Sequence, residues 1–171
     1  MMGNYAFFAE ALRYPAPDRV PGLRSLLMDV TPGAIQKTCR AFLSKIEVMS
    51  LSDWEELYTR TLDLNPTTIP YIGFQIWGES YRRGEFLAKM NRSLQSYAID
   101  LDGELPDHLV PVLRYLEAAS DPLPQLLEVM GPAVQRMIDV LHKQEPQNPY
   151  CSLLEGVRMQ LQARQATAAA V

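Results

Sequence analysis

Residues 34–49, AIQKTCRAFLSKIEVM, carry the clearest structural signal in the chain. The apolar side chains recur at steps of four, three, four and three, at Ile35, Cys39, Phe42, Ile46 and Met49. With about 3.6 residues per helical turn, this spacing places all of them on one face. Thr31 and Pro32, just before the stretch, suit an N-cap and a first helical turn. The stretch therefore predicts an amphipathic helix.

The same helical pattern recurs along the rest of the chain. Further apolar stripes begin near Leu51, Leu109, Leu126 and Tyr150, and shorter helices are expected over residues 5–14 and 23–30. No run alternates apolar and polar residues as a half-buried strand does. We predict an all-α, single-domain helical bundle of about seven to nine helices over residues 1–165, with residues 166–171 as a frayed tail.

Composition limits the classes of function. The chain has 171 residues, 47% hydrophobic and 21% charged, which is typical of one globular domain. A net charge of -4 disfavours nucleic-acid binding, which needs a concentrated basic surface. Two Cys and two His are too few to suggest a zinc site or a disulfide framework. We find no secretory signal pattern and no membrane-spanning window, so we expect a cytoplasmic protein without stable membrane insertion.

The stretch from Tyr58 to Phe86, YTRTLDLNPTTIPYIGFQIWGESYRRGEF, departs from this regular pattern. Residues 63–70 read as a proline-bearing loop, and residues 71–94 as one helix that contains Gly73, Gly78 and Gly84. A glycine inside a helix costs about 1 kcal/mol relative to alanine. These glycines therefore indicate close packing, a kink or a ligand pressed against the helix.

Aromatic side chains accompany these glycines. Phe74, Trp77 and Tyr81 form a ridge at helical spacing, and Glu79 and Arg83 are placed to pair at i and i+4. An aromatic ridge is more often core than binding site. The long uncharged loop before the ridge favours the functional alternative, because loops beside rigid elements often carry function.

A second segment, residues 100–109, reads as a turn leading into a helix. Pro106 suits the helix start, and Asp107 suits its positive end. One interpretation makes His108 a capping or hinge contact. The alternative is that this segment lines a groove together with the Trp77 region.

Catalytic motifs are missing from the sequence. We find no nucleophile elbow, phosphate-binding loop, dinucleotide fingerprint or zinc-protease motif. Cys39 lies on an apolar stripe, and Cys151 has no base near it in the sequence, so both read as structural. We therefore predict a protein that is not an enzyme, with no catalytic residues, metal or cofactor.

Three motifs resemble the TorD/DmsD/NarJ-type redox-enzyme maturation chaperones. They are the Tyr-x-x-x-Leu-Asp run of residues 58–63, the Gly-Glu-Ser-x-x-Arg-Gly run of residues 78–84 and the Glu-Leu-Pro-Asp-His run of residues 104–108. Leu12 to Asp18, LRYPAPD, is similar to the end of the family's first helix. The order and spacing of the motifs favour the NarJ-like branch, the nitrate reductase molybdenum cofactor assembly chaperones.

The resemblance implies a system-specific cytoplasmic chaperone. Such proteins bind the N-terminal leader of the catalytic subunit of a molybdenum-dependent oxidoreductase, and hold the apo-enzyme for insertion of its molybdopterin cofactor. Nitrate reductase is the nearest client, and another member of the dimethyl sulfoxide reductase superfamily is the alternative.

A peptide groove for such a leader needs aromatic anchors and an acidic rim. The candidate peptide-binding residues are Tyr58, Asp63, Tyr71, Phe74, Trp77, Glu79, Tyr81, Arg83, Glu104, Pro106, Asp107 and His108. Two rival hypotheses stay open: a non-catalytic helical adaptor, and a cofactor-binding helical enzyme. A homodimer is also open, because helical proteins with proline-rich hinge loops can exchange elements between chains.

Overall fold

The computed structural model describes residues 4–171, so the first three residues of the predicted domain lie outside the described part. The predicted all-α, single-domain bundle is confirmed: this part contains nine α-helices, one π-helical turn and no strand beyond an isolated bridge. The elements are α1 (Tyr5–Ala11), α2 (Arg19–Asp29), α3 (Ala34–Ile46), α4 (Leu51–Tyr58), η1 (Thr59–Asp63), α5 (Ile72–Trp77), α6 (Tyr81–Ser96), α7 (Leu109–Ala118), α8 (Pro124–Gln144) and α9 (Pro149–Ala169).

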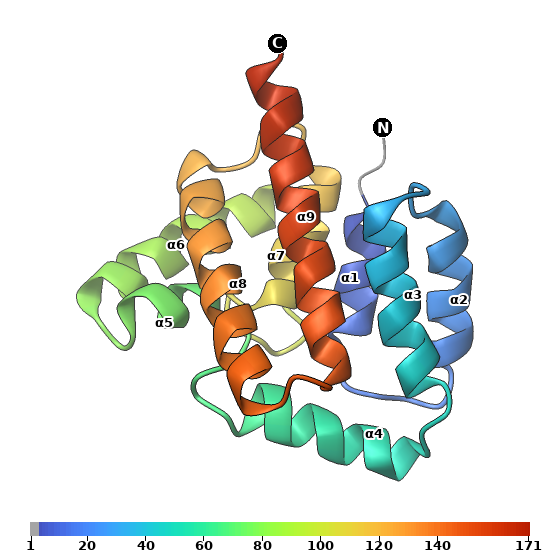
Figure 1. Ribbon diagram of the computed structural model, residues 1–171. Helices are drawn as coiled ribbons and strands as arrows, with labels where there is room; N and C mark the ends of the chain where they lie inside the picture. The colour runs from blue at the N-terminus through green and yellow to red at the C-terminus, as the bar shows by residue number, and fades with distance from the viewer. Residues whose placement is uncertain (1–3) are drawn as a thin grey trace.

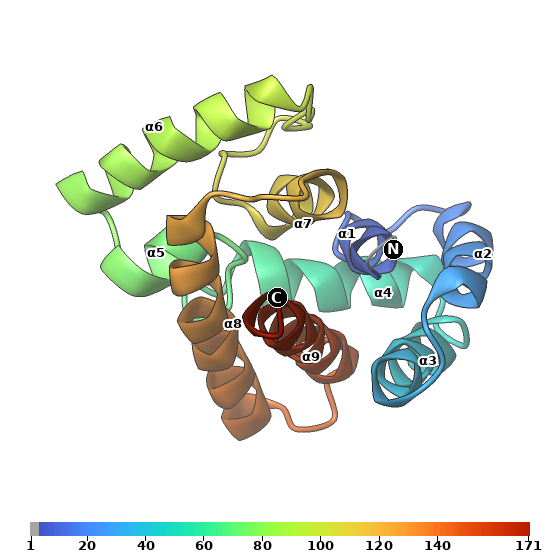
Figure 2. The same ribbon diagram turned by 90° about the horizontal axis from the view of Figure 1, so that it is seen from above.

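Helix α9 lies between α8 and α3 on one side of the bundle (Figure 1). Helices α1 and α7 pack against each other behind it, and α6 forms the far side (Figure 2). Helix α4 crosses the lower end of the bundle in Figure 1. No helix of the described residues has both the length and the apolarity to cross a lipid bilayer.

The core forms where α1 meets α3, α7 and α9. Phe8 of α1 and Phe42 of α3 are fully buried, and the Phe42 ring packs against Tyr150 of α9 with centroids 5.2 Å apart. Gly156 permits this close packing, since a Cβ there would lie 2.4 Å from Thr38 Oγ1 and 2.7 Å from Phe8 Cε1. Burial of a large aromatic or aliphatic side chain stabilises the fold by roughly 1.5–3 kcal/mol, so this cluster dominates its stability.

The single helix predicted over residues 71–94 is wrong. The chain breaks after α5 at Gly78, which has a φ of 61° and therefore a conformation that favours glycine. Ser80 then caps α6, its hydroxyl accepting the Arg83 backbone N–H at 3.5 Å. Gly73 and Gly84 consequently lie on different helices and do not share a face.

The start of α3 differs from the predicted one, because Gly33 and not Thr31 stands at its N-cap position. Ser50 caps α4 by accepting the Asp53 N–H at 3.1 Å, and α8 begins at Pro124. The amphipathic stripe predicts each of these helices but does not fix its first residue.

Helix α9 continues to Ala169, through the segment where we expected a frayed tail. Its last residues are exposed and extend beyond the body of the molecule (Figure 1). Arg164 holds this part of the helix by donating to the carbonyl oxygens of Leu116 at 3.0 Å and Ala119 at 2.7 Å. These carbonyls lie at the end of α7, where backbone acceptors lack helical partners.

Candidate functional site

The segment before α5 and the segment before α7 are joined by backbone pairing. Tyr71 and His108 form an antiparallel bridge. The Ile72 N–H donates to the Asp107 carbonyl at 3.0 Å, and the Leu109 N–H donates to the Pro70 carbonyl at 2.8 Å. The motif of residues 104–108 is thereby brought into direct contact with the segment that enters α5, although more than thirty residues separate them in the sequence.

Arg83 of α6 is tied to Asp107 by a two-point ion pair. The Arg83 Nε lies 2.9 Å from Asp107 Oδ2, and its Nη2 lies 3.2 Å from Oδ1. Asp107 is 0% exposed, so the pair is almost completely removed from water. Arg83 therefore pairs with Asp107 and not, as the sequence predicted, with Glu79. The buried Asp107 carboxylate links α6 to the segment before α7.

Gly73 makes room for this ion pair. A Cβ at Gly73 would lie 2.8 Å from Asp107 Oδ2 and 3.2 Å from the Phe86 ring. The Arg83 guanidinium in turn lies over the rings of Phe74 and Tyr71, 5.5 Å and 5.8 Å from their centroids. Close packing is therefore the structural reason for glycine at this position.

His108 caps α7 and is buried. Its Nδ1 accepts the Val110 N–H at 3.1 Å, so this nitrogen carries no proton. The ring packs edge-on against Tyr71, with centroids 5.0 Å apart. Burial lowers the pKa of His108, opposed by the nearby charges of Glu104 and Asp107. The contacts of His108 are therefore those of a helix cap, as one of the two sequence interpretations expected.

Glu104 links the buried residues around the Arg83–Asp107 ion pair to the surface. Its carboxylate accepts the hydroxyl hydrogen of Tyr71. Burial raises the pKa of the Tyr71 hydroxyl, and the hydrogen bond to Glu104 raises it further, so Tyr71 stays a neutral donor. Partial burial raises the pKa of Asp63, and the charge of Glu104 adds to this effect. Glu104 therefore acts on Asp63 through its charge, and neither carboxylate forms an ion pair within residues 4–171.

The π-helical turn η1 brings Asp63 to this position. It follows α4 directly and adds a wider turn, closed by the Leu64 N–H donating to the Thr59 carbonyl at 3.0 Å. Single π-helical turns are uncommon and occur frequently at functional sites. Asn148 at the start of α9 fixes this turn by donating to Thr61 Oγ1 at 2.9 Å, and Thr68 donates to the Thr61 carbonyl.

Tyr14 completes the surface and was missed by the sequence reasoning. Its ring packs edge-on against Tyr58, with centroids 5.2 Å apart, and it is 49% exposed. Arg19 holds the segment by donating to the Tyr14 carbonyl at 2.9 Å. The Leu-Arg-Tyr-Pro motif was the signal that could have identified it. We call Tyr14, Asp63, Tyr71, Glu104 and the half-exposed Leu105 the acidic-aromatic surface.

The predicted residues thus divide into three groups. Tyr58, Asp107 and His108 are buried, and the peptide-binding role predicted for them stays a prediction. Asp63, Tyr71, Glu104 and Pro106 remain at least partly accessible near one another. A separate set lies around the α5–α6 break: Phe74, Trp77, Glu79, Tyr81 and Arg83.

The α5–α6 break is only partly open to solvent. Trp77 packs against Phe86 with centroids 5.4 Å apart, and the Arg82 guanidinium lies 5.9 Å from the Trp77 ring. Tyr81, in contrast, is 83% exposed. The ridge predicted from helical spacing is therefore split between a packed Trp77 and a free Tyr81.

Two surface hollows lie away from these residues. One of about 290 Å³ is lined by α3, α9 and the turn before α9, and one of about 320 Å³ is lined by residues of α1, α2 and α7. Neither is lined by a predicted peptide-binding residue. The groove we expected beside His108 is not one of these hollows.

The described residues offer little for metal or thiol chemistry. Residues 4–171 contain no group of three or more His, Cys, Asp or Glu side chains placed to hold a metal ion. Burial raises the pKa of Cys39 to about 12 and also raises the pKa of Cys151. Because the thiolate is the nucleophilic form, both cysteines are held in their unreactive state.

Comparison with known proteins adds no relative. No protein-family model matches the chain, and a search of curated proteins finds no match either.

Proposed function

We propose that the protein is a cytoplasmic, system-specific chaperone that binds the N-terminal leader of a molybdopterin oxidoreductase catalytic subunit. It holds the apo-enzyme until its molybdenum cofactor is inserted. A nitrate reductase is the nearest client. The chaperone itself performs no catalytic step in this proposal.

One observation carries the proposal: residues from all four segments of the resemblance meet in space. Tyr14 contacts Tyr58, the charge of Glu104 acts on Asp63, and Arg83 pairs with Asp107. Tyr14, Asp63 and Leu105 stay exposed, while the Arg83–Asp107 ion pair beneath this region is buried. Exposed contact residues on a rigid support are what a binding surface requires.

The charges favour a basic peptide as the ligand. The charge of Glu104 adds to the rise in the pKa of Asp63 caused by burial, and neither carboxylate forms an ion pair within residues 4–171. A lysine or arginine of a leader peptide relieves this repulsion, while Tyr14 and Leu105 supply apolar contact. The net charge of -4 adds long-range attraction for a basic segment.

The test is calorimetry of the full chain with the leader peptide of a molybdoenzyme catalytic subunit. We expect micromolar or tighter binding that weakens with added salt. A double variant, Asp63→Asn with Glu104→Gln, should reduce the affinity by about tenfold or more, corresponding to about 1.4 kcal/mol. Asp29→Asn with Glu128→Gln is the matched control, because it removes two exposed carboxylates elsewhere and should leave binding unchanged.

Two results would count against the proposal. Equal loss of affinity in both double variants would mean that net charge alone attracts the peptide. No binding to any such leader would favour the helical adaptor, in which the same residues serve only to hold α4, α6 and α7 together.

A further inference from the structure

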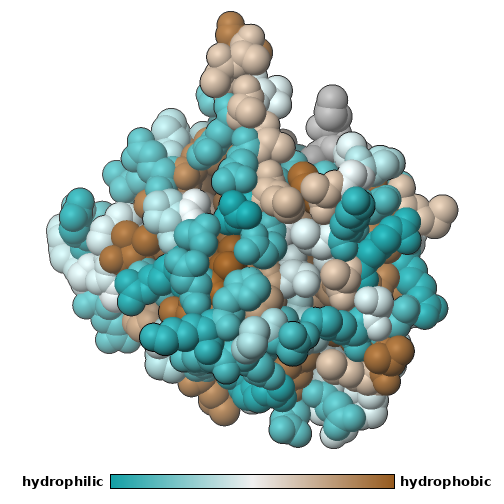
Figure 3. All heavy atoms as spheres, in the orientation of Figure 1, coloured by the Kyte–Doolittle hydropathy of each residue, from teal (hydrophilic) through white to brown (hydrophobic). Residues whose placement is uncertain are grey.

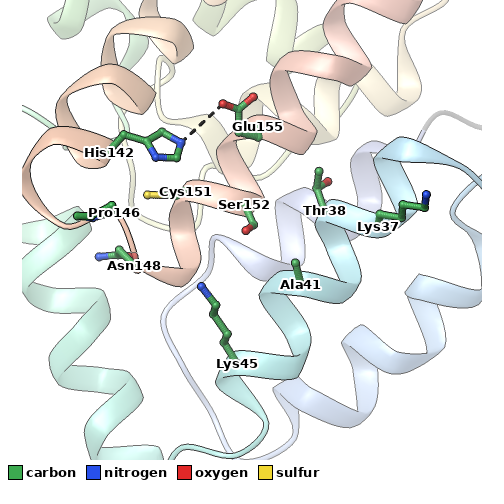
Figure 4. Close-up of a pocket in the computed structure, with 10 residues that line it drawn as sticks. All are labelled: Lys37, Thr38, Ala41, Lys45, His142, Pro146, Asn148, Cys151, Ser152 and Glu155. Atoms are coloured by element: carbon green, nitrogen blue, oxygen red, sulfur yellow. Dashed lines mark ion pairs between the residues drawn. The ribbon is translucent and has the colours of Figure 1, made fainter.

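A hollow of about 290 Å³ opens between α3 and α9 (Figure 4). These two helices lie on the side of the bundle opposite α6 (Figure 2). Its walls come from α3, the end of α8, the α8–α9 turn and the first turns of α9. The lining residues are Lys37, Thr38, Ala41, Lys45, His142, Pro146, Asn148, Cys151, Ser152 and Glu155. None of them belongs to the acidic-aromatic surface.

Lys45 of α3 supplies positive charge at this hollow. Lys37 also lines it, but more than two helical turns separate the two lysines, and Figure 4 shows the Lys37 amine directed away from α9. Lys45 forms no ion pair within residues 4–171, and the only partner of its Nζ there is the Gln147 carbonyl, at 3.2 Å. Figure 4 shows the Lys45 amine directed toward the turn before α9.

The acidic residue of the hollow is already engaged. Glu155 lies 2.8 Å from the Arg158 guanidinium and 3.7 Å from His142 Nε2. Its charge is thus offset by Arg158 within α9. Lys45, on the α3 side, remains as the unpaired charge of the hollow.

The wall between these charges is mainly apolar. Ala41, Pro146 and the Cys151 side chain contribute to it. Burial raises the pKa of Cys151, so its sulfur is a neutral thiol that adds no charge. Ser152 adds a hydroxyl group, which Figure 4 shows on the side of α9 that faces α3.

We propose that this hollow binds a small organic anion in which one carboxylate is attached to a short apolar body. Lys45 binds the carboxylate and the apolar wall covers the body. The start of α9 is not the anion site, because Asn148 already accepts the N–H groups of Tyr150 and Cys151. A cavity of 150 Å³ holds benzene, so about 290 Å³ suits a ligand of roughly ten non-hydrogen atoms.

The surrounding surface favours a small ligand over a protein partner. The face that carries the hollow is mainly hydrophilic, with apolar atoms in small separate patches (Figure 3). Protein docking surfaces usually present a larger contiguous apolar area. The site is independent of the proposed leader-binding surface and does not depend on that function.

The test is an NMR titration of the full chain with three probes: hexanoate, hexylamine and inorganic phosphate. We expect hexanoate to shift the backbone amide signals of residues 37–45 and 148–156 in a saturable way. Hexylamine has the same apolar body with the opposite charge, and phosphate has the charge without the body. Both should leave these signals unchanged at the concentration where hexanoate saturates.

Variants locate the two parts of the site. Lys45→Met removes the charge of the hollow while keeping an apolar side chain, and should weaken hexanoate binding by about tenfold or more. Ala41→Leu fills the hollow without a change of charge and should abolish the shifts. Arg40→Met removes an exposed charge of α3 that does not line the hollow, and should have no effect.

Three results would overturn the proposal. They are the absence of saturable shifts with hexanoate, equal shifts with hexylamine or phosphate, and unchanged hexanoate affinity in Lys45→Met. Unchanged binding in Ala41→Leu would also overturn the placement of the apolar body.

Discussion

Gly73 and Gly84 come from the same motif-rich stretch, yet their surroundings differ. Gly73 faces the Asp107 carboxylate and the Phe86 ring, whereas a Cβ at Gly84 would meet nothing within 4 Å. Gly73→Ala should therefore destabilise the protein by about 1–3 kcal/mol through overpacking. Gly84→Ala, inside α6, should stabilise it by about 0.5–1 kcal/mol. Chemical denaturation of the two variants measures both values.

We predict that the two substitutions change the free energy of unfolding in opposite directions. If Gly73→Ala is as stable as the unmodified protein, the Asp107 carboxylate moves freely and is not fixed by Arg83. If Gly84→Ala is destabilising, α6 makes a close contact on that face that the described residues do not contain.

The Arg83–Asp107 pair allows a second prediction at the residue scale. Asp107→Asn leaves the Arg83 guanidinium, which is only 12% exposed, without its counter-charge. Removing one partner of a buried pair costs about 3–5 kcal/mol, and we expect a loss near the lower limit because Arg83 is not fully enclosed. Glu47→Gln, which breaks the exposed pair with Arg24, should cost about 1 kcal/mol or less.

The comparison of these two variants decides the role of Asp107. A large loss of unfolding free energy in Asp107→Asn alone identifies a structural tie. Similar small losses in both variants would mean that Asp107 is free to act as a rim carboxylate, as the sequence suggested.

Single residues show where sequence reasoning reaches its limit. An acidic residue just inside a helix start usually faces solvent, so the sequence suggested a rim position for Asp107. Its burial depends on Arg83, which lies 24 positions earlier and reaches it only after the chain turns at Gly78. Asp63 and Glu104 retain the accessibility expected of them because neither acquires an internal cation.

At the scale of elements, the His108 cap of α7 makes stability depend on pH. Burial lowers the pKa of His108 in the folded state below the ordinary value of 6.5. Between these two values the unfolded chain binds more protons than the folded protein. The free energy of unfolding should therefore rise as the pH increases through this window, and fall on acidification.

His108→Asn separates this contribution from those of other groups. Asparagine can still accept the Val110 N–H as an N-cap, but it does not titrate. Denaturant titrations between pH 5 and 7.5 should show a smaller slope for His108→Asn than for the unmodified protein. Identical slopes would place the titration on another group and contradict the burial of a neutral His108.

A sequence specifies the apolar face of a helix better than it specifies where the helix ends. Ile35, Cys39, Phe42 and Ile46 predict α3 because apolar periodicity responds directly to burial on one side. The α5–α6 break was missed although Gly78 and Ser80 carry both end signals, a glycine C-cap and a serine N-cap. Apolar spacing continues across the break, and that continuity suggested one long helix.

At the scale of the whole molecule, helix class and helix number follow from the apolar stripes, while the arrangement of the helices does not. The interdigitation of α1, α3 and α9 requires Gly156 to lie against Phe8, a contact between opposite ends of the chain. The π-helical turn likewise depends on Asn148, which is 87 positions from its partner Thr61. Such long-range contacts join the helices into one core and give no local sequence pattern.

The reactivity of the two cysteine thiols can measure how this core opens. Cys39 is fully enclosed by the core, whereas Cys151 lines the hollow between α3 and α9. In the folded protein neither thiol should react readily with a disulfide reagent at neutral pH, since burial raises the pKa of both. Cys39 should become reactive only on global unfolding, so the denaturant dependence of its labelling should equal that of the circular dichroism transition.

Cys151 should react through a smaller opening, because only the first turn of α9 needs to move away from the hollow. Its labelling rate should accordingly depend less steeply on denaturant than that of Cys39. The single variants Cys39→Ala and Cys151→Ala isolate the two rates. Labelling of Cys39 that is fast, or less steep than global unfolding, would show that α3 separates from α9 without unfolding the bundle, and that the core is not one cooperative unit.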